Sequence, residues 1–240
     1  MRDDLTSLAT GGWGTFVVAY AAFLLSHMVP ARPAVRARLV ATLGERGYLA
    51  GYGIVAVLIL AWLIVAAGQA PYVALWPYAA WHVWLADVAM LAACVLAAFA
   101  IGASNPLSVG GRAGRFDPMR PGVAGAVRHP LLAALAIWAF VHALANGDLA
   151  HLLLFGGFLL FAVLGMRIVD RRRRRTMGEA AWRRMAAHTS NVPLAALIAG
   201  RWRPRPGPRD GIRLALGVGL WLLLVALHPL VIGVSPLPLG

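Results

Sequence analysis

The sequence is poor in the residues on which many soluble domains and hydrolytic enzymes rely. It contains no lysine, one cysteine and only nine aspartate and glutamate residues in 240 positions. The single cysteine, Cys94, excludes an intrachain disulfide. With 60% hydrophobic and 13% charged residues, the composition is typical of an integral membrane protein.

Six long apolar runs are separated by short links. A bilayer core about 30 Å thick requires roughly 20 mostly apolar residues for each spanning helix. The runs therefore predict an all-α fold, a polytopic membrane helical bundle of about six transmembrane helices that forms one domain over residues 1–240. The predicted spans are Trp13–Pro30, Tyr48–Gly68, Trp81–Ala103, His129–Ala145, Leu149–Val169 and Leu214–Val234.

The charge of the links alternates along the chain. Arginine is abundant in links 30–47, 104–128 and 170–213, whereas links 69–80 and 146–148 and the tail after residue 234 contain no basic residue. Basic links remain on the cytoplasmic side of a membrane. The pattern predicts a bacterial inner-membrane protein whose N- and C-termini are both periplasmic. Topology and the lipid bilayer account for the net charge of +13, so no nucleic-acid partner is expected.

Two stretches of the arginine-rich links have distinctive compositions. Residues 102–125 are rich in glycine and proline, and a link of this length is expected to be either mobile or functional. Residues 177–188 form a predicted amphipathic helix in which Trp182, Met185 and Ala186 share one face. We expect this helix to lie on the inner membrane surface, with Trp182 at the depth of the lipid headgroups.

Histidines are the main ionisable residues in the predicted spans or at their ends. Ionisable groups are costly to bury in a membrane, so each is a candidate functional residue. Neutral imidazole is a good axial ligand for haem iron, and a helical bundle can hold a haem. His82 and His151, at arginine-free span ends, are expected only to hydrogen-bond to water or lipid. Six of the seven histidines lie in the predicted spans or at their ends, namely His27, His82, His129, His142, His151 and His228.

The fourth predicted span carries the densest group of polar and aromatic residues. Trp138, His142 and Asn146 recur every four residues and therefore share one face of a helix. His129 and His142 lie roughly 20 Å apart along the helix axis and about 140° apart around it. They cannot bind one metal ion together, so a second ligand must come from another helix.

These residues belong to an ordered pattern that resembles the NnrU family, which includes the 15-cis-zeta-carotene isomerases of carotenoid biosynthesis. The likeness extends over nearly the whole chain. It is carried by Ser26-His27, Leu43-Gly44-Glu45-Arg46, Arg128-His129-Pro130, Trp138, His142, Asn146-Gly147-Asp148, Asp170-Arg171-Arg172, Gly178, Thr189-Ser190, Val192-Pro193, Gly200-Arg201 and His228-Pro229.

The resemblance implies a haem b cofactor. In the isomerase branch, two histidines hold an iron that, when reduced, supports cis–trans isomerisation of a double bond, and their positions match His27 and His142. Trp138 and Asn146 would then lie beside the haem, and an apolar small-molecule substrate and an electron donor are implied. Bacterial members are associated instead with nitric oxide and denitrification. By depth alone His27 with His129 is the alternative pair, because the predicted topology places His27 and His142 toward opposite membrane surfaces.

Two other functional classes remain open. Small membrane methyltransferases that use S-adenosylmethionine also carry Arg-His-Pro before a long helix, followed by an acidic pair, but this chain has Asp170-Arg171 at the place of that pair. A non-catalytic membrane partner or assembly factor, in which every histidine is structural, would need no cofactor. A Soret absorption band in the purified protein would distinguish a haem protein from both alternatives.

Overall fold

The computed structural model describes residues 12–30, 32–111, 114 and 116–237. Two arginines of the predicted basic links, Arg112 and Arg115, and the two ends of the chain lie outside the described residues. The chain divides into two compact units, and each is described by itself. Unit 1 consists of residues 1–76 with 147–154, and unit 2 consists of residues 77–146 with 155–240.

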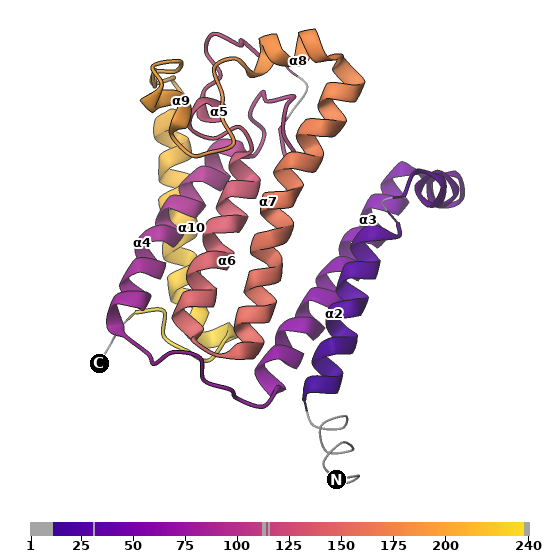
Figure 1. Ribbon diagram of the computed structural model, residues 1–240, viewed down its shortest axis with the longest axis vertical. Coiled ribbons are helices and arrows are strands. Elements are labelled where there is room, and N and C mark those ends of the chain that lie inside the picture. The colour runs from indigo at the N-terminus through magenta and orange to yellow at the C-terminus, as the bar shows by residue number, and fades with distance from the viewer. Residues whose placement is uncertain (1–11, 31, 112–113, 115, 238–240) are drawn as a thin grey trace. The chain divides into compact units, whose positions relative to one another are not determined.

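The described chain is helical, as a polytopic membrane bundle requires. Four helices are long and apolar enough to cross a bilayer, namely α3 (Pro33–Gln69), α4 (Ala80–Ala100), α7 (Leu149–Met177) and α10 (Asp210–Val231). Two shorter apolar helices, α2 (Trp13–Met28) and α6 (Pro130–Asn146), coincide with the other two predicted spans. The links contain α5 (Val123–Ala126), α8 (Glu179–Ala186) and α9 (Ala195–Ile198) (Figure 1).

Unit 1 is built on the packing of α2 against α3. Gly44 has a φ of 70°, which kinks α3 between its arginine-containing start and its apolar part. After the kink, the Tyr48 hydroxyl donates a hydrogen bond to the Pro30 carbonyl oxygen at 3.2 Å. Beyond the other end of α3, the Leu75 backbone N–H donates to the Gly147 carbonyl oxygen at 2.9 Å. This hydrogen bond attaches the link after α3 to the start of α7.

Unit 2 is organised around α4, which packs against both α6 and α10 (Figure 1). The contact with α10 depends on Gly217, where an added Cβ would lie 2.7 Å from the Val95 Cα. Small residues of this kind allow two membrane helices to approach closely. On its other side α6 packs against α7, and the Trp138 ring centroid lies 5.2 Å from that of Phe155 and 5.6 Å from that of Phe158.

Successive long helices of unit 2 run in opposite directions, so the unit has two distinct ends (Figure 1). The arginine-rich end contains the last residues of α4 and α7 and the first residues of α6 and α10. The arginine-poor end contains the first residues of α4 and the last residues of α6 and α10. The alternating charge of the links therefore places the arginine-rich links at one end of unit 2 and the arginine-poor links at the other.

The amphipathic helix of the third basic link is covered by protein. α7 continues eight residues beyond the predicted end of its span, and Gly178, with a φ of 81°, separates it from α8. Trp182 and Ala186 of α8 share a buried face that packs on Leu107. The shared face is confirmed, and because only 6% of Trp182 is exposed, protein covers it rather than lipid headgroups. The depth of Trp182 in the membrane stays a prediction. Leu107 belongs to the glycine-rich link, which is folded at this contact.

Candidate functional site

Arg128 is the centre of a buried polar cluster at the arginine-rich end of unit 2. Its guanidinium donates from Nη1 to Asp170 Oδ2 at 2.6 Å and from Nε to Thr189 Oγ1 at 2.8 Å. Its backbone N–H donates to the Ser190 carbonyl oxygen at 2.7 Å, and its own carbonyl accepts from Asn105 Nδ2 at 3.0 Å. One residue therefore joins α7 to the links that precede α6 and follow α8.

His129 is completely buried beside Arg128, and both of its ring nitrogens have partners. Nε2 lies 3.2 Å from Asp170 Oδ1, and Nδ1 lies 3.1 Å from Ser108 Oγ. An ionised carboxylate can only accept a hydrogen bond, so Nε2 carries the hydrogen, and Nδ1 of the neutral ring accepts from the Ser108 hydroxyl. While these two bonds persist, neither nitrogen of His129 offers a lone pair to a metal.

Asp170 lies just beyond the apolar part of α7 and accepts from three side chains. In addition to Arg128 and His129, Asn191 donates from Nδ2 to Asp170 Oδ2 at 2.8 Å. Burial alone would raise the pKa of the Asp170 carboxyl, but the His129 and Asn191 hydrogen bonds and the Arg128 charge outweigh it and hold this pKa below its usual value. Asp170 is therefore the ionised partner of a buried ion pair.

Trp182 extends the cluster through its aromatic ring. The guanidinium carbons of Arg128 and Arg174 lie 4.9 and 3.9 Å from the ring centroid, which is within the range of a cation–π interaction. Because α8 follows α7 after a glycine break, these contacts fix α8 against the rest of unit 2. The contacts of the whole cluster hold these segments of unit 2 together and do not form an open binding site.

His142 lies toward the opposite, arginine-poor end of unit 2, in an aromatic environment. Its Nδ1 lies 2.8 Å from the Trp138 carbonyl oxygen, so Nδ1 carries the hydrogen and Nε2 keeps the lone pair. The ring centroids of Trp138 and Phe155 lie 5.5 and 5.1 Å from that of His142. Asn146 donates from Nδ2 to the His142 carbonyl oxygen at 2.8 Å. The predicted grouping of Trp138, His142 and Asn146 is thus present as direct contacts.

His27 has the same local geometry within unit 1. Its Nδ1 lies 2.8 Å from the Phe23 carbonyl oxygen, which is again four residues earlier on the same helix. The ring centroids of Phe23 and Tyr52 lie 4.2 and 6.1 Å from that of His27. The histidines of haem and metal sites commonly donate one N–H to a backbone carbonyl and ligate through the other nitrogen. Each of the two predicted ligands, within its own unit, is oriented in this way.

The remaining span histidines have other surroundings. His151 Nδ1 lies 2.7 Å from Asp148 Oδ2, and His228 Nδ1 lies 2.7 Å from the Val234 carbonyl oxygen. His82, expected at a wet interface, is instead buried, with 6% of the residue exposed. Over the described ranges, no three histidine, cysteine or carboxylate side chains converge as the ligands of one metal ion.

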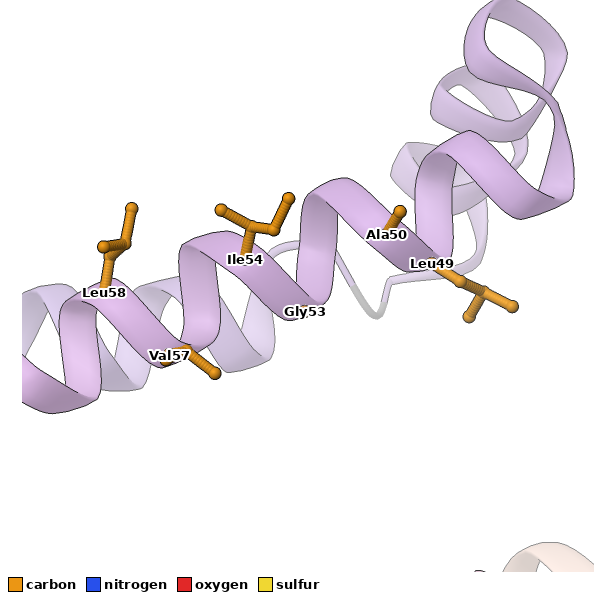
Figure 2. A pocket seen from close by; sticks show the side chains of 6 residues that line it. All are labelled: Leu49, Ala50, Gly53, Ile54, Val57 and Leu58. Carbon is orange, nitrogen blue, oxygen red and sulfur yellow. The ribbon is translucent and has the colours of Figure 1, made fainter.

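An apolar surface of α3 is the other feature considered as a binding site. Figure 2 shows its six residues, which all belong to one helix, with none contributed by another helix. Ile54, Val57 and Leu58 are each more than 60% exposed. An exposed apolar face of a spanning helix suits contact with lipid chains, so this surface supports membrane insertion and carries no chemical site.

Several members of the polar cluster are absent from the sequence-based candidates. Asn105, Ser108 and Asn191 contribute hydrogen bonds from links, where polar residues are common and no periodicity distinguishes them. The signal that could have identified Asn105 and Ser108 is the leucine between them, Leu107, because an apolar residue in a polar link favours local burial.

Comparison with known proteins agrees with the pattern of motifs. A family model described as "NnrU protein" matches residues 15–236, which is nearly the whole chain. No curated protein and no solved structure gave a match. The matched range contains the polar cluster at the arginine-rich end as well as His27 and His142.

Proposed function

Because the chain belongs to the NnrU family, we propose that this integral membrane protein binds haem b, which the imidazoles of His27 and His142 would hold. The observation that carries the proposal is the geometry of His142. Its Nδ1–H is fixed by the Trp138 carbonyl oxygen, and its Nε2 retains a lone pair in aromatic surroundings. His27 repeats the backbone hydrogen bond within its own unit.

The chemistry of the residues around His142 supports the proposed porphyrin site. Trp138, Phe155 and Phe158 contact one another and supply flat apolar surfaces that would exclude water from the cofactor. The Trp138 carbonyl oxygen would hold the His142 imidazole in one tautomer and one orientation. Asn146 bonds to the His142 backbone and would stabilise the last turn of α6.

Bound haem would supply one-electron redox chemistry at its iron. On the resemblance to the isomerase branch, we propose a redox-dependent cis–trans isomerisation of a double bond in an apolar polyene as the reaction class. An apolar substrate would reach the protein through the bilayer, and the electron donor would be a separate partner. In this proposal His129 has a structural role, since both of its ring nitrogens are already paired within the polar cluster.

Ligand substitution tests the proposed site. His27→Ala and His142→Ala should each remove one strong-field ligand and change the low-spin visible spectrum of the haem protein. His151→Ala is the matched control, because the His151 Nδ1 is paired with Asp148 and the residue is assigned no ligand role. If both ligand variants keep the wild-type reduced spectrum, the assignment of His27 and His142 is wrong.

A further inference from the structure

The start of α3, residues 33–43, is a helical segment that the rest of the protein leaves uncovered. Every residue of this segment is at least partly exposed, and Leu43 is 56% exposed. The amphipathic helix α8 differs, because its Trp182 is buried against Leu107. Segment 33–43 is therefore a helix whose sides remain available to a surface outside the chain.

An apolar row runs along one side of this segment. Val35, Leu39 and Leu43 recur every four residues and therefore lie on one face of the helix. At about 100° per residue, Arg38 and Arg36 lie on either side of that face. An apolar row between arginines is typical of a helix that lies in a membrane interface, where the row enters the acyl-chain boundary and the arginines reach the headgroups.

A glycine kink separates the segment from the spanning part of α3. Gly44 has a φ of 70° and a ψ of 165°, a combination that is essentially restricted to glycine. Across the kink, Arg36 Nη2 donates to Glu45 Oε1 at 2.6 Å, and the Arg36 guanidinium carbon lies 5.4 Å from the Tyr48 ring centroid. Figure 1 shows the start of α3 turned away from the direction of the rest of the helix.

The length of α3 places the kink at the edge of the bilayer core. A core about 30 Å thick takes roughly 20 helical residues. α3 has 37 residues, of which residues 45–69 suffice to cross the core. Segment 33–43 therefore extends beyond the core, and the kink turns it from the axis of the span toward the plane of the membrane.

The charge of this region suits an anionic surface. Residues 30–47 contain four arginines and one carboxylate, which give a net charge of +3. The carboxylate, Glu45, is paired with Arg36, so Arg32, Arg38 and Arg46 carry the excess. Basic links remain cytoplasmic, and the cytoplasmic leaflet contains anionic lipids that attract arginines close to the membrane.

We propose that segment 33–43 is an interfacial anchor that lies flat on the membrane and binds anionic phospholipids. Its apolar row enters the acyl-chain boundary, and Arg32 and Arg38 contact the phosphate groups of the lipids. The Gly44 kink sets the direction of the anchor relative to the span that follows it. This binding surface goes beyond the proposed haem site and does not depend on it.

A fluorescent label reports which surface covers the segment. In full-length protein in lipid nanodiscs, the single cysteine, Cys94, is replaced by alanine, and a fluorophore is attached to Leu39→Cys or Ala41→Cys. These two positions lie about 160° apart around the helix. In nanodiscs that contain phosphatidylglycerol, the label at position 39 should be protected from aqueous acrylamide, whereas the label at position 41 should be quenched. In nanodiscs of phosphatidylcholine alone, protection at position 39 should fall.

A charge variant tests the recognition of anionic lipid. An arginine near an anionic surface changes a binding equilibrium by about five-fold, so Arg38→Gln should lower the ratio of protected to accessible label at position 39 by about that factor. Arg205→Gln is the matched control, because it removes one exposed arginine from another link and should leave the ratio unchanged.

A backbone variant tests the kink. Gly44→Ala should make the label at position 39 accessible in both lipids, because alanine does not readily adopt the backbone angles of the kink. Gly53→Ala is the matched control on the same helix, since nothing lies within 4 Å of its added Cβ.

The other outcomes would overturn the proposal. Equal quenching at positions 39 and 41 in phosphatidylglycerol nanodiscs would show that the segment stands away from the membrane and would leave a protein partner as its occupant. Equal protection of position 39 in both lipids would show apolar contact without recognition of anionic headgroups. Equal losses with Arg38→Gln and Arg205→Gln would assign the effect to the net charge of the protein and not to this segment.

Discussion

The two ends of unit 2 bury polar side chains in different ways. At the arginine-rich end, Arg128, His129 and Asp170 satisfy one another through short hydrogen bonds within the chain. At the arginine-poor end, His142 is fixed by one nitrogen only, and the buried Nδ1 of His82 has no partner in the described chain. In the first arrangement the Arg128, His129 and Asp170 side chains pair with one another and stabilise the fold, whereas the second leaves ring nitrogens that a ligand can use.

The difference explains why motif residues should not all be assigned to one site. Arg128-His129-Pro130 and His142 belong to the same motif and the same helix region, yet they lie at opposite ends of α6. His129 is engaged by Asp170 and Ser108, while His142 is surrounded by aromatic rings. A shared sequence pattern therefore contains one structural part and one part that we propose to be functional.

Reporter fusions would give the largest effect, because they test which end of unit 2 faces the cytoplasm. Fusions after Gly110 and Arg205 should report a cytoplasmic location, since both positions lie in arginine-rich links. A fusion after Gly240 should report the periplasm. The measurement is the activity of a reporter pair that is active on only one side of the membrane. A cytoplasmic signal after Gly240 would mean that the number of spans differs from six by an odd number.

Removal of the carboxylate from the polar cluster should strongly destabilise the protein. Asp170→Ala leaves the Arg128 charge buried without a counter-ion, and breaking a buried pair in this way costs about 3–5 kcal/mol. Glu179→Ala is the control, because its pair with Arg183 is exposed and should contribute at most about 1 kcal/mol. Chemical unfolding in detergent measures both. If the two substitutions lower the free energy of unfolding equally, the distinction between a buried and an exposed ion pair is wrong.

His129→Ala should have a smaller effect on stability and none on the cofactor. The substitution leaves one Asp170 oxygen without its hydrogen bond, which costs about 1–3 kcal/mol. Haem content per protein, measured as a pyridine haemochrome, should remain at the wild-type level. Complete loss of haem would instead support His129 as the partner of His27 and would remove the contrast between the two ends.

The last expected effect is confined to the packing of α10 against α4. Gly217→Ala would place a methyl group 2.7 Å from the Val95 Cα, and overpacking of this kind costs about 1–3 kcal/mol. Gly219→Ala is the matched control on the same helix, because nothing lies within 4 Å of its added Cβ. Thermal unfolding should show a lower midpoint for the first variant only. Equal midpoints would show that this close contact is not required.

The sequence predicted the helices better than it predicted their partners. Apolar run length placed the spans, and α7 starts at the predicted Leu149, because membrane insertion is a local property of about 20 residues. The Arg128–Asp170 pair joins residues 42 positions apart, and no local periodicity specifies such a contact. Protein covers both Trp182 and His82, which the sequence did not predict. Amphipathicity predicts that a face is buried but not what covers it, and a position at a span end does not predict which side chain points inward.

The absorption spectrum of the purified protein tests the central claim most directly. When the protein is produced with ample haem, it should show a Soret band. Because the sequence contains no Cys-x-x-Cys-His motif for covalent attachment, the haem should extract completely into acid–acetone. Absence of Soret absorbance in well-folded protein would contradict haem binding and would make a non-catalytic membrane partner the leading account.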